Sequence, residues 1–211
     1  DKLPVRYREG RFYLPIGTSP STHILKFSNP YFKHLPANEL VSSAIASDLE
    51  LATCETTLES FESESALLVA RYDRCEIDGE IRRLHQEDLC QALGLSSNRK
   101  YEAEGGPSFA DCLQIVTEVS AEPALDTRRL VRWIAFCGVV GNADGHAKNL
   151  SLLRSTEGSW RLAPFYDLIC TSVYDRVDRR LAMKVGPNAD PGMIRGRDWR
   201  ALAAQARVGA R

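Results

Sequence analysis

The chain has 211 residues, enough for one substantial hydrophobic core or for two smaller lobes. Hydrophobic residues make up 44% and charged residues 26%, which is ordinary for a soluble globular protein. Because 27 Lys and Arg residues are balanced by 28 Asp and Glu residues, the overall charge predicts neither nucleic-acid nor anionic-membrane binding, and the longest apolar runs are too short to span a bilayer.

The first third of the chain has the pattern of β-strands. Segments 3–8 and 11–16 flank a Glu-Gly turn and predict a hairpin, and 21–27 follows a Pro-containing turn as a third strand. The nearly continuous apolar run 65–74 predicts a buried strand.

A helix is predicted over 39–51, between these strands, with Asn38 as its N-cap. Its apolar residues share one face: Leu40, Ala44, Ile45 and Leu49.

Beyond residue 75 the pattern becomes helical. Helices are predicted over 84–95, with Gly94 as C-cap, over 105–120 and over 126–141, the last beginning at a capping Asp126. The tail 196–211 is also predicted to be helical. These elements predict an α+β protein with a β-rich lobe, residues 1–74, followed by a helical lobe, residues 75–211, and a boundary near 73–84.

Six cysteines are spread singly along the chain, 15 to 33 residues apart. No CxxC pair or short-spaced cluster of His and Cys occurs, so the sequence predicts no zinc site. Reduced, mostly buried thiols in a cytoplasmic protein are the favoured interpretation.

The helix predicted over 126–141 leads into a cluster of polar residues, in VVGNADGHAKNLSLL. Asp144 and Asn149 are five positions apart, the spacing of a protein-kinase catalytic loop. In such a loop a carboxylate orients the acceptor hydroxyl, while a neutral amide oxygen holds Mg²⁺ without adding charge. Asp and Asn also turn chains after helices, so this pair alone leaves both interpretations open.

Three further residues stand in the order that phosphoryl transfer requires. Asp167, in LAPFYDLI, follows Asn149 by 18 residues and is a candidate for a second metal-binding carboxylate. Lys26 ends a predicted strand and Glu39 lies in the following helix, as do the phosphate-contacting lysine of kinases and its partner. Each alone is more often a surface charge, but the complete order favours a kinase.

Several motifs together resemble the HipA family of bacterial toxin serine/threonine kinases, which have a two-lobed, protein-kinase-like fold. The resemblance covers about residues 1–185. The motifs are PSTHILKF, ARYDR, RLHQEDLCQALG, KYEAEGGPS, GNADGHAKNLSLL and LAPFYDLI.

The resemblance assigns roles to individual residues. Lys26 matches the lysine that contacts the nucleotide phosphates, and Lys2 matches the end of the phosphate-binding loop. Arg71 and Tyr72 match the connection that holds adenine, largely through backbone groups.

The remaining matches lie in the helical part. Asp144 matches the catalytic base, and His146 and Asn149 match the nucleotide- and metal-contacting part of its loop. Tyr166 precedes Asp167, which with Asn149 matches the metal-binding pair.

The resemblance implies an ATP- and Mg²⁺-dependent Ser/Thr protein kinase that causes growth arrest, with a substrate such as an aminoacyl-tRNA synthetase. It also implies a helix-turn-helix antitoxin (HipB-like) as partner, through which DNA is mainly contacted, and no membrane.

The chain looks cut short compared with the family. We do not find the glycine-containing start of the phosphate-binding loop, the autophosphorylated serine beside it, a small N-terminal subdomain or most of the final helical region. A non-catalytic nucleotide- or antitoxin-binding module and a small-molecule kinase are the alternatives.

Overall fold

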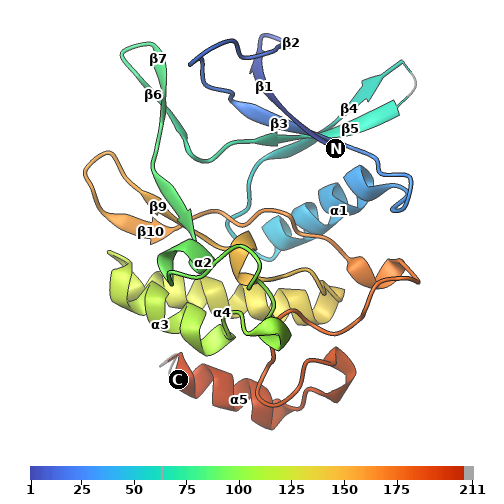
Figure 1. Ribbon diagram of the computed structural model, residues 1–211, viewed down its shortest axis with the longest axis vertical. Helices are drawn as coiled ribbons and strands as arrows, with labels where there is room; N and C mark the ends of the chain where they lie inside the picture. Colours follow the sequence, from blue (N-terminus) through green and yellow to red (C-terminus); the bar gives the residue numbers. More distant parts are fainter. Residues whose placement is uncertain (63, 207–211) are drawn as a thin grey trace. The chain divides into compact units, whose positions relative to one another are not determined.

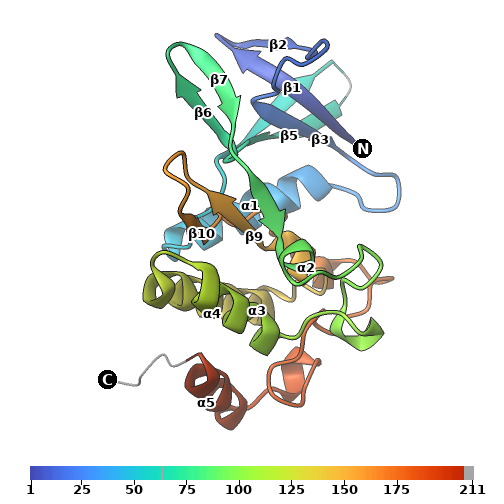
Figure 2. The ribbon, with the colours of Figure 1, turned by 60° about the vertical axis from the view of Figure 1, so that its left-hand side comes forward.

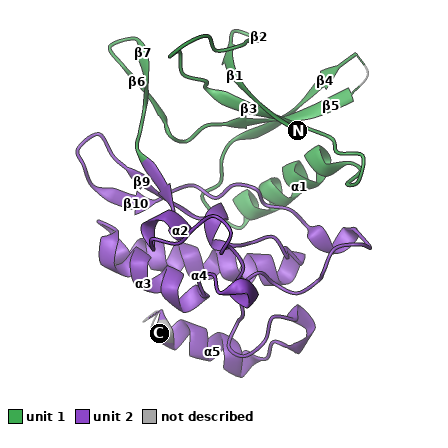
Figure 3. Ribbon diagram, viewed as in Figure 1, with its two compact units in different colours: residues 1–85 green, residues 86–211 purple. Residues whose placement is uncertain are grey.

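The computed structural model describes residues 1–62 and 64–206. The chain divides into two compact units, residues 1–85 and 86–211 (Figure 3). The sequence analysis predicted that the β-rich part ends at residue 74 and the helical part begins at residue 75. A hairpin of β6 (Arg74–Ile77) and β7 (Glu80–Arg83), which the sequence analysis did not predict, belongs to the first unit.

Unit 1 contains a five-stranded antiparallel sheet in the order β2-β1-β3-β5-β4 (Figure 1). Its strands are β1 (Lys2–Arg8), β2 (Arg11–Tyr13), β3 (His23–Phe27), β4 (Thr56–Phe61) and β5 (Glu64–Ala70). All four strands predicted here are present, and β1 and β3 lie within two residues of their expected bounds. Strand β2 ends three residues earlier than predicted because it pairs only with the end of β1.

Both faces of β5 are covered, which explains its nearly continuous apolar sequence. On one face Leu68 and Ala66 pack with Val5 and Leu25, and the aromatic rings of β1, β2 and β3 cover this cluster. On the other face lies α1 (Leu35–Asp48), which contacts β3, β4 and β5 and runs along the sheet in both views (Figures 1 and 2). β5 ends at Ala70, four residues before the predicted end.

Helix α1 begins earlier than predicted and uses a different face. It starts at Leu35, after His34 in a left-handed conformation and with a proline in the first turn, so Asn38 lies inside the helix and is not its cap. Its buried residues are mostly small or polar: Pro36, Glu39, Ser42, Ser43 and Ala46. The predicted apolar face is largely exposed, because an ion pair between Glu39 and Lys26 of β3 turns the polar face toward the sheet.

The hairpin β6–β7 turns at Asp78 and Gly79, both with positive φ. This is the backbone of a type I′ turn, for which Asp-Gly is a preferred sequence. The dipeptide in EIDGEI was therefore a usable signal for the two strands that sequence analysis missed. β4 was missed as well; it pairs along the whole of β5.

Unit 2 is mainly helical and carries a small antiparallel sheet in the order β10-β9-β8 (Figure 2). Its strands are β8 (Gln86–Asp88), β9 (Ser151–Arg154) and β10 (Trp160–Leu162), and its α-helices are α2 (Leu89–Ala92), α3 (Phe109–Val119), α4 (Pro123–Val140) and α5 (Gly196–Gln205). Short 3₁₀ turns cover Glu102–Glu104, Ala147–Asn149, Thr171–Val173 and Pro191–Met193.

Several helix ends differ from the sequence prediction. The helix expected over 84–95 is strand β8 followed by the single turn α2, because Asp88 caps α2 with a capping box; Gly94 does follow its C-terminus with φ of 68°. Helix α3 begins at Phe109, inside the predicted range 105–120, because Ser108 caps it with a capping box. Helix α5 ends at Gln205, and the last five residues of the predicted tail helix lie outside the described residues.

The core of unit 2 is built around Trp133 of α4, which is fully buried. Its indole stacks on Phe165 at 5.9 Å between ring centroids and meets the edge of Phe109 at 6.4 Å. Four of the six cysteines are buried, which agrees with the expectation of mostly buried thiols: Cys54, Cys90, Cys112 and Cys137. No helix in the described part of the chain is both long and apolar enough to cross a membrane.

Candidate functional site

The polar cluster after α4 is a tight loop fixed at both ends. Helix α4 ends at Val140, and Gly141 caps it with φ of 69°. Gly138 lies inside α4, where an added Cβ would be 3.5 Å from the ring of Trp199. The buried Thr171 hydroxyl then donates to the Gly141 carbonyl at 2.7 Å and accepts from the Ala143 N–H at 2.8 Å.

Hydrogen bonds within the loop join the two residues that its spacing singled out. The Asn149 side-chain amide donates to the Asp144 carbonyl at 2.8 Å, and the His146 N–H donates to the same oxygen at 2.9 Å. The Asp144 N–H in turn donates to the side chain of Asn142 at 3.1 Å. Asn142 thus forms the turn, whereas the Asp144 carboxylate accepts no hydrogen bond from a backbone N–H in the described part of this loop.

The Asp144 side chain is 47% exposed, and its described partners converge on a single oxygen, Oδ1. The Tyr101 hydroxyl donates to Oδ1 at 2.6 Å. The His146 Nε2 atom lies 3.5 Å from Oδ1 and the Lys100 ammonium 3.9 Å from it. Among the described residues no hydrogen bond reaches the second oxygen, Oδ2. That oxygen is available to a group arriving from outside the chain.

His146 is buried beneath this carboxylate, with 4% of its surface exposed. Burial lowers its pKa, an effect that the Asp144 charge partly offsets and that Lys100 reinforces. The imidazole is therefore neutral at neutral pH. The Tyr101 ring packs edge-on against it at 5.3 Å between centroids, and its Nδ1 atom has no hydrogen-bond partner in the described chain.

A second segment is attached to the same loop. The Tyr166 hydroxyl donates to the Lys148 carbonyl at 3.0 Å and lies 2.7 Å from the Ser151 hydroxyl. Asp167 follows in a left-handed conformation with φ of 53°, which non-glycine residues rarely adopt and which is often found at functional sites. The negative charge of Asp167 acts to raise the pKa of His146.

The oxygen atoms offered by Asn149 and Asp167 suit Mg²⁺. Since the Asn149 Nδ2 group donates to the Asp144 carbonyl, its Oδ1 is the end left to bind a cation. No group of three or more His, Cys, Asp or Glu residues in the described chain could hold a metal ion by itself. Mg²⁺ is usually held by one or two carboxylates together with substrate phosphates.

In unit 1, Lys26 and Glu39 form the pair that the sequence predicted. The ammonium and the carboxylate are 2.5 Å apart, with 11% and 4% of the side chains exposed. A buried ion pair of this kind is costly to desolvate and is therefore weak evidence for a stabilising role.

Arg71 and Tyr72 lie directly after β5, within unit 1. The Arg71 guanidinium forms two hydrogen bonds with Asp73, at 3.0 and 2.8 Å. The backbone N–H of Arg71 donates to the Thr22 carbonyl. The side chain of Arg71 is therefore committed to Asp73.

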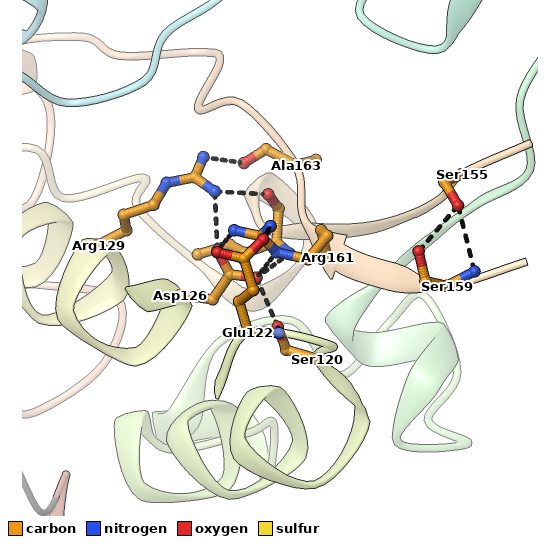
Figure 4. Close-up of polar contacts among 9 residues, drawn as sticks. Ser120, Glu122, Asp126, Arg129, Ser155, Ser159, Arg161 and Ala163 are labelled. Atoms are coloured by element: carbon orange, nitrogen blue, oxygen red, sulfur yellow. Dashed lines mark hydrogen bonds and ion pairs between the residues drawn. The ribbon is translucent and has the colours of Figure 1, made fainter. Parts of the chain in front are cut away.

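A buried ionic cluster anchors the beginning of α4 to β10 (Figure 4). Asp126, predicted to cap the helix, lies within its first turns with no exposed surface, because α4 begins at Pro123. Arg161 donates to it at 2.9 and 3.1 Å, Arg129 at 2.9 Å and the Ser120 hydroxyl at 2.6 Å. Arg161 also contacts Glu122. Burial alone would raise the Asp126 pKa, but these hydrogen bonds lower it to about 2.

Sequence analysis missed Tyr101 as a part of the Asp144 site and Asp126 as a buried acid. Tyr101 stands in KYEAEGGPS, a motif noted only for its resemblance, and no spacing rule connects it with a residue 43 positions away.

Comparison with solved structures identifies the class of fold. A Shewanella oneidensis structure, described as the toxin–antitoxin system HipA, HipB and its operator DNA complex, matches with a TM-score of 0.89 and 31% identity, covering 97% of this chain and 50% of that chain. The Helicobacter pylori proinflammatory kinase CtkA matches with a TM-score of 0.54 and 16% identity, over 82% of this chain and 55% of that chain, which supports the fold alone. The expected α+β fold of the kinase type is thus confirmed.

The family model described as the HipA-like C-terminal domain matches residues 1–211, and the chain belongs to this family. The Serine/threonine-protein kinase toxin HipA of Shewanella oneidensis is 34% identical over 206 residues, which are 92% of this chain and 47% of that protein. The Sinorhizobium fredii protein Y4mE is 37% identical over 209 residues, 99% of this chain and 50% of that protein. The chain therefore spans about half the length of these relatives.

Proposed function

We propose that this chain carries out ATP-dependent phosphorylation of serine or threonine hydroxyls in a protein. The observation that carries the proposal is the state of Asp144. Its carboxylate is half-exposed on a loop pinned by Thr171, one of its oxygens is held by Tyr101, and the other has no hydrogen-bond partner in the described chain. A base that accepts a proton from an incoming hydroxyl needs this combination of a fixed side chain and an open oxygen.

In this proposal each residue of the chain has a separate task. Asp144 orients the acceptor hydroxyl and takes its proton, and Lys26, oriented by Glu39, contacts the phosphates. Asn149 and Asp167 would hold Mg²⁺, which neutralises phosphate charge when it is bound. His146, neutral and buried, packs against Asp144 and does not take up the proton that leaves the acceptor hydroxyl.

Four residues have supporting roles in nucleotide binding. Lys2 lies directly opposite Lys26 in the β1–β3 pair and adds positive charge for the phosphates. Arg71 and Tyr72 would present backbone groups to adenine. Tyr166 holds the Asp167 segment to the loop through the Lys148 carbonyl.

The biological setting is proposed from the relatives. The matched Shewanella protein is named a toxin kinase and its structure contains HipB and operator DNA, which supports an antitoxin partner, through which DNA is contacted, for this chain. We further propose growth arrest through a protein substrate such as an aminoacyl-tRNA synthetase, in the cytoplasm, where buried thiols stay reduced.

Labelled ATP tests the activity. The natural gene product, purified in full and incubated with ATP labelled at the γ-phosphate, Mg²⁺ and dephosphorylated casein, should transfer label to serine or threonine, as read by phosphoamino-acid analysis. Asp144→Ala should abolish transfer while the protein still binds nucleotide. The matched control is Asp178→Ala, at an exposed residue whose side chain accepts hydrogen bonds from Arg180. Nucleotide binding without transfer to any acceptor would support a non-catalytic module instead, and label on a metabolite alone would support a small-molecule kinase.

A further inference from the structure

The segment 99–106 folds tightly around the backbone of Tyr101. The Tyr101 carbonyl accepts hydrogen bonds from the N–H groups of Glu104, at 3.0 Å, and Gly106, at 2.9 Å. Gly105 has φ of 81°, and a Cβ on Gly106 would come within 2.7 Å of the Tyr101 carbonyl oxygen. The two glycines of KYEAEGGPS are therefore required by this winding.

The wound segment is also fixed to the rest of unit 2. The Glu102 N–H donates to the Ala182 carbonyl at 3.0 Å, and its carboxylate accepts from the Lys184 N–H at 2.6 Å. The Tyr101 ring then packs edge-on against the buried His146, and the Lys100 ammonium lies 4.8 Å from the ring centroid. The Tyr101 hydroxyl is thus held at a defined place, and that place is 2.6 Å from Oδ1 of Asp144.

We propose that Tyr101 is a positioning residue for phosphotransfer, whose hydroxyl fixes Oδ1 of Asp144 so that Oδ2 receives the proton of the acceptor. This inference rests on the proposed function and deepens it. In the step concerned, the acceptor oxygen forms a bond to the γ-phosphorus, the bond from that phosphorus to the ADP oxygen breaks, and the acceptor proton moves to Oδ2. Tyr101 keeps its own proton throughout.

Two observations support this role over that of a simple packing residue. Burial and the contact with Asp144 raise the pKa of Tyr101, so the hydroxyl stays a donor over the whole working range of pH. The half-exposed Asp144 side chain has no other described hydrogen-bond donor within 3.0 Å. Without the hydroxyl, the described contacts of the carboxylate are the longer ones to His146, at 3.5 Å, and to Lys100, at 3.9 Å. Positioning accounts for a large part of catalysis in phosphoryl transfer.

The test compares Tyr101→Phe with wild type, using the natural gene product, ATP, Mg²⁺ and dephosphorylated casein. The variant keeps the ring against His146 and loses only the hydroxyl. We expect kcat to fall about ten- to a hundredfold, the range for a lost hydrogen bond to a charged group, while the KM for ATP and the unfolding midpoint stay unchanged. Tyr13→Phe, on an exposed tyrosine of β2, is the matched control and should leave kcat unchanged.

Two further variants separate the hydrogen bond from its surroundings. Lys100→Gln removes the nearby charge but not the hydroxyl, and should change kcat less than about fivefold. Gly106→Ala keeps the hydroxyl but displaces the segment that carries it, and should lower kcat as Tyr101→Phe does.

The outcomes are distinct. An unchanged or raised kcat in Tyr101→Phe, or phosphate on Tyr101 itself, would overturn the inference, since the hydroxyl would then be neutral, an obstacle or an acceptor. An inactive wild type would instead overturn the proposed function, from which this inference follows.

Discussion

Lys2 lies directly opposite Lys26 in the antiparallel pair of β1 and β3. Opposed residues of such a pair point to the same face of the sheet, and like charges placed there repel. Glu39 forms an ion pair with Lys26.

The pair of lysines gives a graded prediction for nucleotide binding. Lys26→Gln should raise the KM for ATP more than about tenfold, because it removes the buried ammonium that we propose contacts the phosphates. Lys2→Gln should raise it only about two- to fivefold, and this smaller effect should fade at high salt because Lys2 is exposed. Initial rates over a range of ATP concentrations, at two salt concentrations, measure both. Equal effects of the two variants would contradict the assignment.

The buried ion pair predicts a separation of stability from activity. Glu39→Gln leaves Lys26 buried without its carboxylate and should destabilise the protein by about 3 kcal/mol, read by urea unfolding. The double variant Lys26→Met with Glu39→Leu should recover most of that stability, since apolar residues can replace a buried pair, yet have no kinase activity. A double variant as unstable as the single one would show that the pair stabilises the fold.

Gly145 is predicted to set the position of the Asp144 loop against α4. A Cβ added at this residue would lie 3.1 Å from the Cys137 sulfur and 3.4 Å from the Trp133 ring, both buried. Gly145→Ala should therefore cost about 1–3 kcal/mol of stability and lower kcat more than it raises the KM for ATP. Gly158→Ala, on the turn between β9 and β10, is a control for stability loss without loss of kcat.

The fold class and the polar loop could be predicted from sequence because both depend on local patterns. Strand alternation in 3–8, the apolar period of α4 and the five-residue spacing of Asp144 and Asn149 are each contained in a short window. The Lys26–Glu39 contact needed only a strand followed by a helix.

The remaining features depend on which face a segment turns inward, and this is a tertiary property. The apolar side of α1 was expected to be buried, but the ion pair selects the small polar side. Asp126 has the sequence signature of a helix cap, and only Arg161, 35 positions away, makes it a buried acid. Tyr101 meets Asp144 for the same reason, through long-range packing.

The Asp126 cluster predicts how stability depends on pH. The folded-state pKa of about 2 lies below the ordinary 3.8, so the unfolded chain binds more protons between these values and stability falls as pH falls through this window. Asp126→Asn cannot titrate, so the stability advantage of wild type over this variant should shrink by about 2 kcal/mol between pH 5 and 2. Urea unfolding of both proteins across this range measures it, and a constant difference would contradict the prediction.

The position of α4 between two attachments has a further consequence. Its first turns hold β10 through Asp126, on the strand that leads to Asp167, and its last turn ends at Gly141, where the Asp144 loop begins. The number of residues in this helix therefore sets the separation and the relative rotation of Asp144 and Asp167. Removing one residue would shorten the helix by about 1.5 Å and turn one end by about 100°. Homologues should accordingly vary in the composition of the exposed side of α4, at positions such as Val139, while its length stays constant.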